Sequence, residues 1–164
     1  MSYAVFAVLL VALDQLTKYL VRVNIPLGGH VPFLPHVMEL TYVRNTGAAF
    51  SILSRHTWLL TLFSLLVVVV LTRVLWKKVI THPLGVYPLT AVIAGGVGNL
   101  IDRLAFGFVT DMFNPLFIRF AVFNVADICI TVGGALTVIY VMFLYDRLEK
   151  KEAPHDAADL SADR

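Results

Sequence analysis

The stretch that decides the fold is Thr57-Trp-Leu-Leu-Thr-Leu-Phe-Ser-Leu-Leu-Val-Val-Val-Val-Leu-Thr-Arg-Val-Leu-Trp76, in which Arg73 is the only charged residue. A helix of about 20 residues is about 30 Å long, which matches the hydrocarbon core of a bilayer. Of the 164 residues, 59% are apolar and 15% are charged, against about 45–50% and about 25% in soluble domains. So short a chain cannot bury this surface in one water-soluble core. The sequence therefore predicts an integral membrane protein and excludes an ordinary cytosolic enzyme, a disulfide-stapled secreted module and a disordered chain.

Three further apolar segments flank this one. We predict an all-α membrane protein with four transmembrane helices, at about 3–21, 57–76, 84–103 and 123–145. The first segment is not a cleaved signal peptide, because it lacks a basic leader and contains Asp14 and Lys18. The four spans form one membrane domain over residues 1–151, and the charged tail at 152–164 is expected to be disordered.

The distribution of basic residues predicts the orientation. Cytoplasmic loops carry an excess of lysine and arginine. The segment that links the second and third spans and the segment after the fourth are the densest in such residues, which are Arg73, Lys77, Lys78, Arg147, Lys150 and Lys151. Both termini are therefore expected in the cytoplasm. The net charge of +2 is too small to indicate a nucleic-acid partner.

Residues 24–56 form a connection too long to be a simple loop. The stretch from His36 to Arg44 alternates roughly and is rich in β-forming residues, and Asn45-Thr-Gly47 is a turn signal. We therefore predict one or two short strands, which would form a small β-rich cradle outside the cytoplasm between the first two helices.

The end of the third span has a polar face. On a helix, Gly95, Asn99 and the pair Asp102 and Arg103 fall at i, i+4 and i+7 or i+8, which is one side. Small residues on that side permit close approach of another helix. The face is either a packing surface with a buried ion pair or part of a functional site.

Two aspartates are expected to meet at one membrane face. Asp127 lies about one turn inside the fourth span, on the same face as Asn124, and Asp111 lies in the connecting segment before it. Ionisable groups inside a membrane are costly and indicate function. Two nearby carboxyls share a proton near neutral pH, and such a pair activates water without a metal. The alternatives are a neutral, hydrogen-bonded Asp127 and a turn-forming Asp111.

The first span carries Asp14 and Lys18 at i and i+4, which is the spacing of an intrahelical salt bridge. This pair is either a structural polar seam or part of the site.

The sequence lacks the residues that metal-dependent, cysteine-dependent and nucleotide-dependent enzymes use. The five histidines are scattered without an HExxH pattern, the single cysteine is Cys129, and there is no nucleotide-binding glycine motif. No metal and no cofactor are expected.

Five motifs together resemble the lipoprotein signal peptidase family, also called signal peptidase II. The resemblance covers nearly the whole chain, and the last three motifs are highly specific in combination. In chain order the motifs are Asp14-Gln-Leu-Thr-Lys18, Arg44-Asn-Thr-Gly-Ala-Ala-Phe50, Gly95-Gly-Val-Gly-Asn-Leu-Ile-Asp-Arg103, Val109-Thr-Asp111 and Phe123-Asn-Val-Ala-Asp127.

The resemblance implies an intramembrane aspartic endopeptidase of the bacterial inner membrane. Such enzymes remove the signal peptide of diacylglyceryl-modified prolipoproteins. They cut before the lipidated cysteine, at the outer surface of the membrane and in contact with membrane lipids. They are inhibited by globomycin. The family's catalytic pair falls on Asp111 and Asp127. Positions that shape or contact the substrate site fall on Asn45, Gly95, Asn99, Asp102, Arg103, Asn124 and Ala126, and support of the fold or substrate contact falls on Asp14 and Lys18.

Two other functions stay open at this point. A small proton- or ion-coupled carrier would use Asp14, Lys18, Asp102 and Asp127 as a relay. Against it, four spans would need to oligomerise to enclose a path, and most of the carboxyls gather at one face. A non-catalytic membrane scaffold would leave Asp127 unexplained.

Overall fold

The computed structural model describes residues 2–47 and 57–149, so the tail predicted at 152–164 lies outside the described residues. Within them are four long apolar helices: α1 (Ser2–Asn24), α2 (Thr57–Trp76), α3 (Pro83–Phe106) and α4 (Val125–Ile139). A π-helical segment, η2 (Tyr140–Leu144), continues α4, and helical residues extend to Glu149. The predicted four-helix membrane fold is confirmed, and each helix reaches far enough to cross a bilayer.

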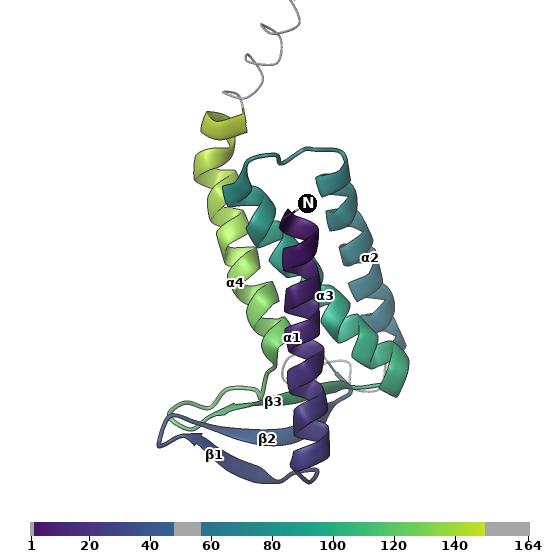
Figure 1. Cartoon of the computed structure of the whole chain (residues 1–164), viewed down its shortest axis with the longest axis vertical. Coiled ribbons are helices and arrows are strands. Elements are labelled where there is room, and N and C mark those ends of the chain that lie inside the picture. The colour runs from purple at the N-terminus through teal and green to yellow at the C-terminus, as the bar shows by residue number, and fades with distance from the viewer. Residues whose placement is uncertain (1, 48–56, 150–164) are drawn as a thin grey trace, which may run out of the picture.

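Helix α3 is the central helix of the bundle. It packs against α1, α2 and α4, as Figure 1 shows, whereas α2 has no buried residue. Exposed leucine, valine and phenylalanine side chains on the outer faces suit a lipid environment. Gly95 allows α4 to approach closely, because a Cβ there would overlap the carbonyl oxygen of Ala126.

A three-stranded antiparallel sheet covers one end of the bundle. Its strands are β1 (His30–Leu34), β2 (Met38–Asn45) and β3 (Val109–Pro115), in the order β1-β2-β3. The cradle predicted between the first two helices is therefore completed by a strand from between α3 and α4. Asp111 lies between α3 and α4 as predicted, but it belongs to a strand and not to a loop: it is on β3, in register with Val43 of β2.

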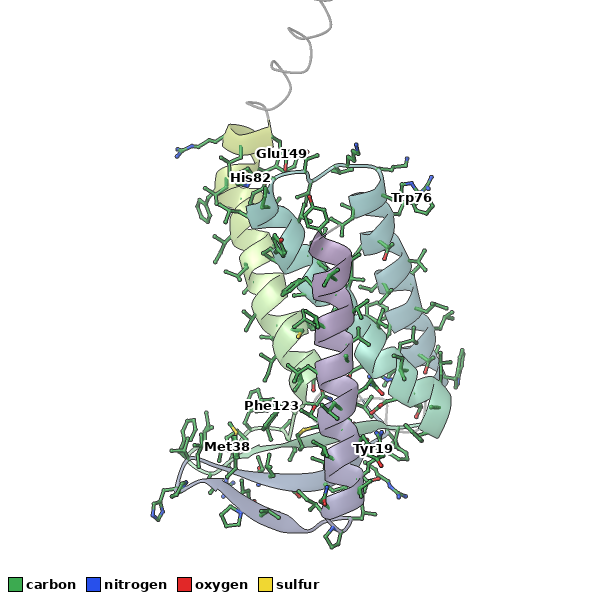
Figure 2. All side chains as sticks on the ribbon, viewed as in Figure 1. Tyr19, Met38, Trp76, His82, Phe123 and Glu149 are labelled. Atoms are coloured by element: carbon green, nitrogen blue, oxygen red, sulfur yellow. The ribbon has the colours of Figure 1, made fainter. Side chains whose placement is uncertain are left out.

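The described chain begins and ends on the same side of the bundle. Figure 1 shows the first turn of α1 and the end of α4 opposite the sheet. In Figure 2, Tyr19 and Phe123 lie close to the sheet, whereas Trp76 and Glu149 lie at the other end. We call these the sheet end and the far end.

Short hydrophobic contacts join the sheet to the helices. Val21, near the end of α1, and Ile25, just after it, pack against Tyr42 of β2 and Met112 of β3, and all four residues are buried. This packing fixes the sheet against the ends of the helices, so the residues on its strands keep constant positions relative to the helix ends.

Candidate active site

Asp127 is fixed by the way α4 begins. Asn124 is the N-cap of this helix: its Oδ1 accepts a hydrogen bond from the backbone N–H of Asp127 at 2.9 Å, and the Asp127 Oδ2 accepts one from the backbone N–H of Asn124 at 3.1 Å. This reciprocal capping box satisfies two backbone donors that a helix start leaves unpaired. It places the Asp127 carboxylate in the first turn of α4, shortly after Phe123, which pairs with Phe113 of β3.

Asp111 comes from β3 and is 2% exposed. Its Oδ1 accepts a hydrogen bond from Nδ2 of Asn124 at 2.6 Å, and its Oδ2 accepts one from Nδ2 of Asn45 at 2.8 Å. Strand β2 supplies Asn45 and the cap of α4 supplies Asn124. The carboxyl group is therefore held from two sides.

Two asparagines connect the aspartates. Nδ2 of Asn99, on α3, donates to Oδ1 of Asp127 at 2.8 Å, and Nδ2 of Asn124 donates to Oδ1 of Asn99 at 3.2 Å as well as to Asp111. The two carboxyl groups thus belong to one hydrogen-bonded cluster, built from α3, β3 and α4. The prediction that Asp111 and Asp127 meet at one end of the bundle is confirmed by these shared partners.

The environment of Asp111 raises its pKa to about 7. Burial is the larger cause, because it disfavours the charged form, and the negative charge of Asp127 adds to it. The hydrogen bonds from Asn45 and Asn124 act in the opposite direction and lower the pKa. Near neutral pH the Asp111 carboxyl is therefore divided between its protonated and ionised forms.

A buried lysine sets the orientation of Asn99. Lys18, which is fully buried, lies 2.9 Å from Oδ2 of Asp14 and 3.6 Å from Oδ2 of Asp102. Its Nζ also donates to Oδ1 of Asn99 at 2.9 Å. Since the amide oxygen faces Lys18, the amide nitrogen of Asn99 faces Asp127. The predicted Asp14–Lys18 salt bridge is confirmed, and it reaches the aspartate cluster through one residue.

The two acidic partners of Lys18 each hold a segment of the site. Oδ1 of Asp14 accepts a hydrogen bond from the backbone N–H of Ala126 at 2.9 Å, which holds the first turn of α4. Oδ2 of Asp102 accepts one from the backbone N–H of Thr110 at 2.8 Å, which holds β3 next to Asp111. The buried charges of Lys18, Asp14 and Asp102 thus have charged and hydrogen-bonding partners, without which they would be strongly destabilising.

Two residues of α1 that were not among the predicted site residues join this network. Gln15 donates from Nε2 to the carboxylates of Asp14 and Asp102. Arg22 lies 3.7 Å from Oδ1 of Asp102 and donates to the Thr110 hydroxyl at 3.0 Å. The signal for Arg22 was present in the sequence, because it continues the four-residue spacing of Asp14 and Lys18 along one face of a helix.

A cavity of about 410 Å³ opens beside the aspartates, and both of them line it. Arg103 also lines it and donates from Nη1 to the Ser64 hydroxyl of α2 at 3.2 Å. Much of the remaining wall is apolar and comes from α4 and the segment before it: Val122, Phe123, Ile128, Ile130 and Val132. Such a cavity suits a substrate with a large apolar part and a polar bond at its end.

Each of the predicted site residues contacts another member, lines the cavity or packs where α3 meets α4. In the described ranges, no group of three or more histidine, cysteine, aspartate or glutamate side chains is placed to hold a metal ion. The fold and the site together define a multi-pass membrane protein with paired carboxyl groups beside an apolar cavity at one end of its helices.

Comparisons with known proteins identify the family. The family model described as "Signal peptidase (SPase) II" matches residues 6–143. The lipoprotein signal peptidase of Streptococcus agalactiae serotype Ia is 46% identical over 129 residues, which are 79% of this chain and 84% of that protein. That of Streptococcus pneumoniae is 45% identical over 139 residues, which are 85% of this chain and 91% of that protein.

Solved structures agree with this result. One described as "Bacterial membrane enzyme structure by the in meso method at 2.3 A resolution" has a TM-score of 0.81 and 31% identity, and the match covers 92% of each chain. A second bacterial membrane enzyme, solved at 1.9 Å, has a TM-score of 0.78 and 29% identity, over 87% of this chain and 94% of the other. The chain belongs to the signal peptidase II family. It is a multi-pass bacterial membrane protein and a peptidase, which disfavours the carrier and the scaffold.

Proposed function

We propose that this chain is an aspartic endopeptidase that removes the signal peptide from diacylglyceryl-modified lipoprotein precursors. Its relatives named lipoprotein signal peptidases support the substrate class. The observation that carries the proposal is the sharing of Asn99 and Asn124 by Asp111 and Asp127 beside one cavity. Such a carboxyl pair hydrolyses an amide bond by general acid–base catalysis.

In the proposed reaction, Asp111 carries the proton and Asp127 acts as the general base. The raised pKa of Asp111 supports this assignment. Asp127 accepts a proton from a water molecule as the water oxygen attacks the scissile carbonyl carbon, while Asp111 donates a hydrogen bond to the carbonyl oxygen. The proton taken up by Asp127 then passes to the leaving amine as the carbon–nitrogen bond breaks.

The hydrogen-bonding residues around the pair are proposed to hold it in position. Asn45 and Asn124 hold Asp111, while Asn99 holds Asp127. Because the Asn99 amide is engaged by Lys18, Asn124 and Asp127, we assign it to the aspartates in preference to the substrate backbone. Arg103, which lines the cavity, is the better candidate for contact with substrate carbonyl oxygens.

The bond to be cut is proposed to be the one before the lipidated cysteine, at the outer face of the bacterial inner membrane. The far end, where Arg73, Lys77, Lys78 and Arg147 lie, would then face the cytoplasm. The acyl chains and the apolar signal peptide would enter from the lipid beside the smaller cavity. Globomycin-type inhibitors are proposed to occupy that same cavity.

The test uses purified enzyme in detergent with two precursors that differ only in the diacylglyceryl group. We expect the lipidated precursor to be shortened on a gel, with a new N-terminal cysteine by mass spectrometry, and the unlipidated one to stay intact. Cleavage elsewhere, or equal cleavage of both precursors, would contradict the proposal. A carrier would instead show solute flux in proteoliposomes without release of a peptide.

A further inference from the structure

A second and larger cavity adjoins the site. Its volume is about 870 Å³, and its walls are the ends of β2 and β3 and the segment from Pro115 to Val122. The two cavities share Asn45, Asp111, Phe120, Ala121 and Val122, but Asp127 lines only the smaller one. Asp111 therefore stands at the boundary between two cavities.

The larger cavity has a basic character. Arg44 and Arg119 line it, and Asp111 is the only acidic residue among the described residues of its wall. Both arginine side chains are exposed. Within residues 2–47 and 57–149, neither arginine has an ion-pair partner. Two unpaired guanidinium groups at one cavity attract an anionic ligand.

Arg44 is held in place without being neutralised. Its Nε donates to the Tyr42 hydroxyl at 3.0 Å, and its guanidinium carbon lies 4.9 Å from the ring centroid of Phe108 and 5.6 Å from that of Tyr42. Cation–π contacts of this kind fix a guanidinium plane and leave its positive charge available. The side chain is therefore ordered in advance for an acidic ligand.

A nearby carboxylate does not cancel this charge by direct contact. Glu39 of β2 lies in register with Asn114, which lines the larger cavity. It accepts a hydrogen bond from Nδ2 of Asn114 at 2.7 Å and lies 2.7 Å from Nδ1 of His30. These hydrogen bonds lower the pKa of Glu39. Its carboxylate is thus engaged on the sheet and is not among the residues that line the cavity.

We infer that the larger cavity receives the polypeptide that follows the scissile bond, and that Arg44 and Arg119 favour precursors with acidic side chains there. This inference rests on the proposed function. A chain lying across Asp111 and Asp127 has to leave the site in two directions. The smaller, apolar cavity suits the lipid-embedded side, and the larger cavity, bordered by the sheet outside the spans, suits the hydrophilic side.

An anionic lipid headgroup has the same charge as an acidic side chain. The polypeptide is favoured because the larger cavity includes Asp111 and Asn45 in its wall, so that it is continuous with the reacting bond. A headgroup site would need no such continuity. The experiment therefore varies the lipid and the substrate separately.

The experiment uses three lipidated precursors that differ only at the second to fourth positions after the cut. These positions are aspartates in the acidic precursor, glycine and serine in the neutral one, and lysines in the basic one. The enzyme is held in bilayer discs of neutral lipid, and kcat/KM is measured for each precursor. We expect about a fivefold higher kcat/KM for the acidic than for the basic precursor, since each exposed ion pair contributes modestly. The ratio falls as salt is added, because salt screens exposed charges.

Variants assign the preference to the arginines. The double variant Arg44→Gln/Arg119→Gln should bring the ratio of acidic to basic kcat/KM close to one. The matched control Arg147→Gln, which removes an exposed arginine at the far end, should leave the ratio unchanged. An apparent Tm in detergent close to that of the unmodified enzyme reports that the double variant is folded.

Each other outcome has one meaning. Equal cleavage of the three precursors by the unmodified enzyme would overturn the inference alone, and so would a preference that survives in the double variant. Rates that rise with anionic lipid equally for all precursors, and lose that rise in the double variant, would overturn it in favour of a headgroup site. No cleavage of any precursor would overturn the proposed function and this inference with it.

Discussion

The two ends of the molecule each contain a carboxylate cluster, and the clusters are built differently. At the far end, Glu149 accepts hydrogen bonds from the backbone N–H groups of Thr81 and His82 at 3.0 Å and 3.2 Å, and from the Tyr140 hydroxyl at 2.6 Å. At the sheet end, Asp111 and Asp127 depend on the side-chain amides of Asn99 and Asn124 and share a cavity. The Glu149 carboxylate accepts hydrogen bonds from backbone groups, whereas Asp111 and Asp127 share side-chain partners.

This difference distinguishes a carboxylate that stabilises the fold from a pair of carboxyl groups that is suited to catalysis. Glu149, at the end of the fourth span, contacts the residues that precede α3, where backbone donors and the helix dipole stabilise a negative charge. These contacts connect the end of the fourth span to the start of α3. Asp111 and Asp127 have no ion-pair partner within the described residues. Amide donors tolerate both the protonated and the ionised carboxyl, whereas a direct salt bridge would hold the group ionised.

The strongest test of this comparison is to remove one acid at a time. Asp111→Asn and Asp127→Asn should each lower the cleavage rate by at least about a thousandfold, because each carboxyl has a separate role in proton transfer. Rates are measured by gel shift with the lipidated precursor. The apparent Tm in detergent should fall only slightly, because asparagine keeps the size of the side chain but places an amide donor where a carboxyl oxygen accepts a hydrogen bond. Substantial cleavage by either purified variant would refute the paired mechanism.

The second test breaks the support behind the site. Lys18→Met leaves Asp14 and Asp102 buried without their central cation, and removing one partner of a buried ion pair costs about 3–5 kcal/mol of folding free energy. We expect a large fall in the apparent Tm and in the cleavage rate. Lys77→Met, which removes an exposed lysine at the far end, is the matched control and should change neither. A stable Lys18→Met enzyme with full activity would show that Asn99 needs no such support.

The third test uses pH. The pKa of Asp111 is raised to about 7, so its proton is present below pH 7 and is lost as the pH rises through that value. If Asp111 acts in its protonated form, kcat/KM should fall above about pH 7, since kcat/KM reports the ionisation of the free enzyme. Removing a hydrogen bond that lowers the pKa should raise it, so Asn45→Ala should move the alkaline limb to higher pH. A limb that moves to lower pH would contradict the assignment.

The sequence was enough to predict the helices and the polar residues, because both depend on local patterns. Long apolar runs predicted the four spans, and the spacing of Asp14 and Lys18 predicted their salt bridge. The capping box of α4 could also have been found, since Asn124 and Asp127 have the N-cap and N3 spacing. Its consequence, that Asp127 lies at the helix start, follows from that pattern alone.

The strand that carries Asp111 was not predictable in the same way. Strand β3 pairs with β2, whose residues lie more than sixty positions earlier in the chain, as the register of Val43 with Asp111 shows. Such a pairing depends on how α1 and α3 bring their ends together, which no local pattern encodes. The contacts of Asn45 with Asp111 and of Asp102 with Thr110 follow from that strand, and so they were missed as well.

The smallest change in stability and cleavage rate is expected from a substitution at the far end. Glu149→Gln removes the negative charge that the N–H groups of Thr81 and His82 bind. It also replaces one carboxylate oxygen, which accepts hydrogen bonds, with an amide nitrogen that faces other donors. A hydrogen bond to a charged group contributes about 1.5–3 kcal/mol and a neutral one about 1 kcal/mol, so the folding free energy should fall by about 1 kcal/mol. The apparent Tm should therefore decrease slightly, while the cleavage rate stays within about twofold of the original, because the aspartate pair lies at the other end of α3. A loss of activity as large as that of Asp127→Asn, at unchanged Tm, would mean that the two ends are coupled through α3 and that the far-end carboxylate serves the reaction as well as the fold.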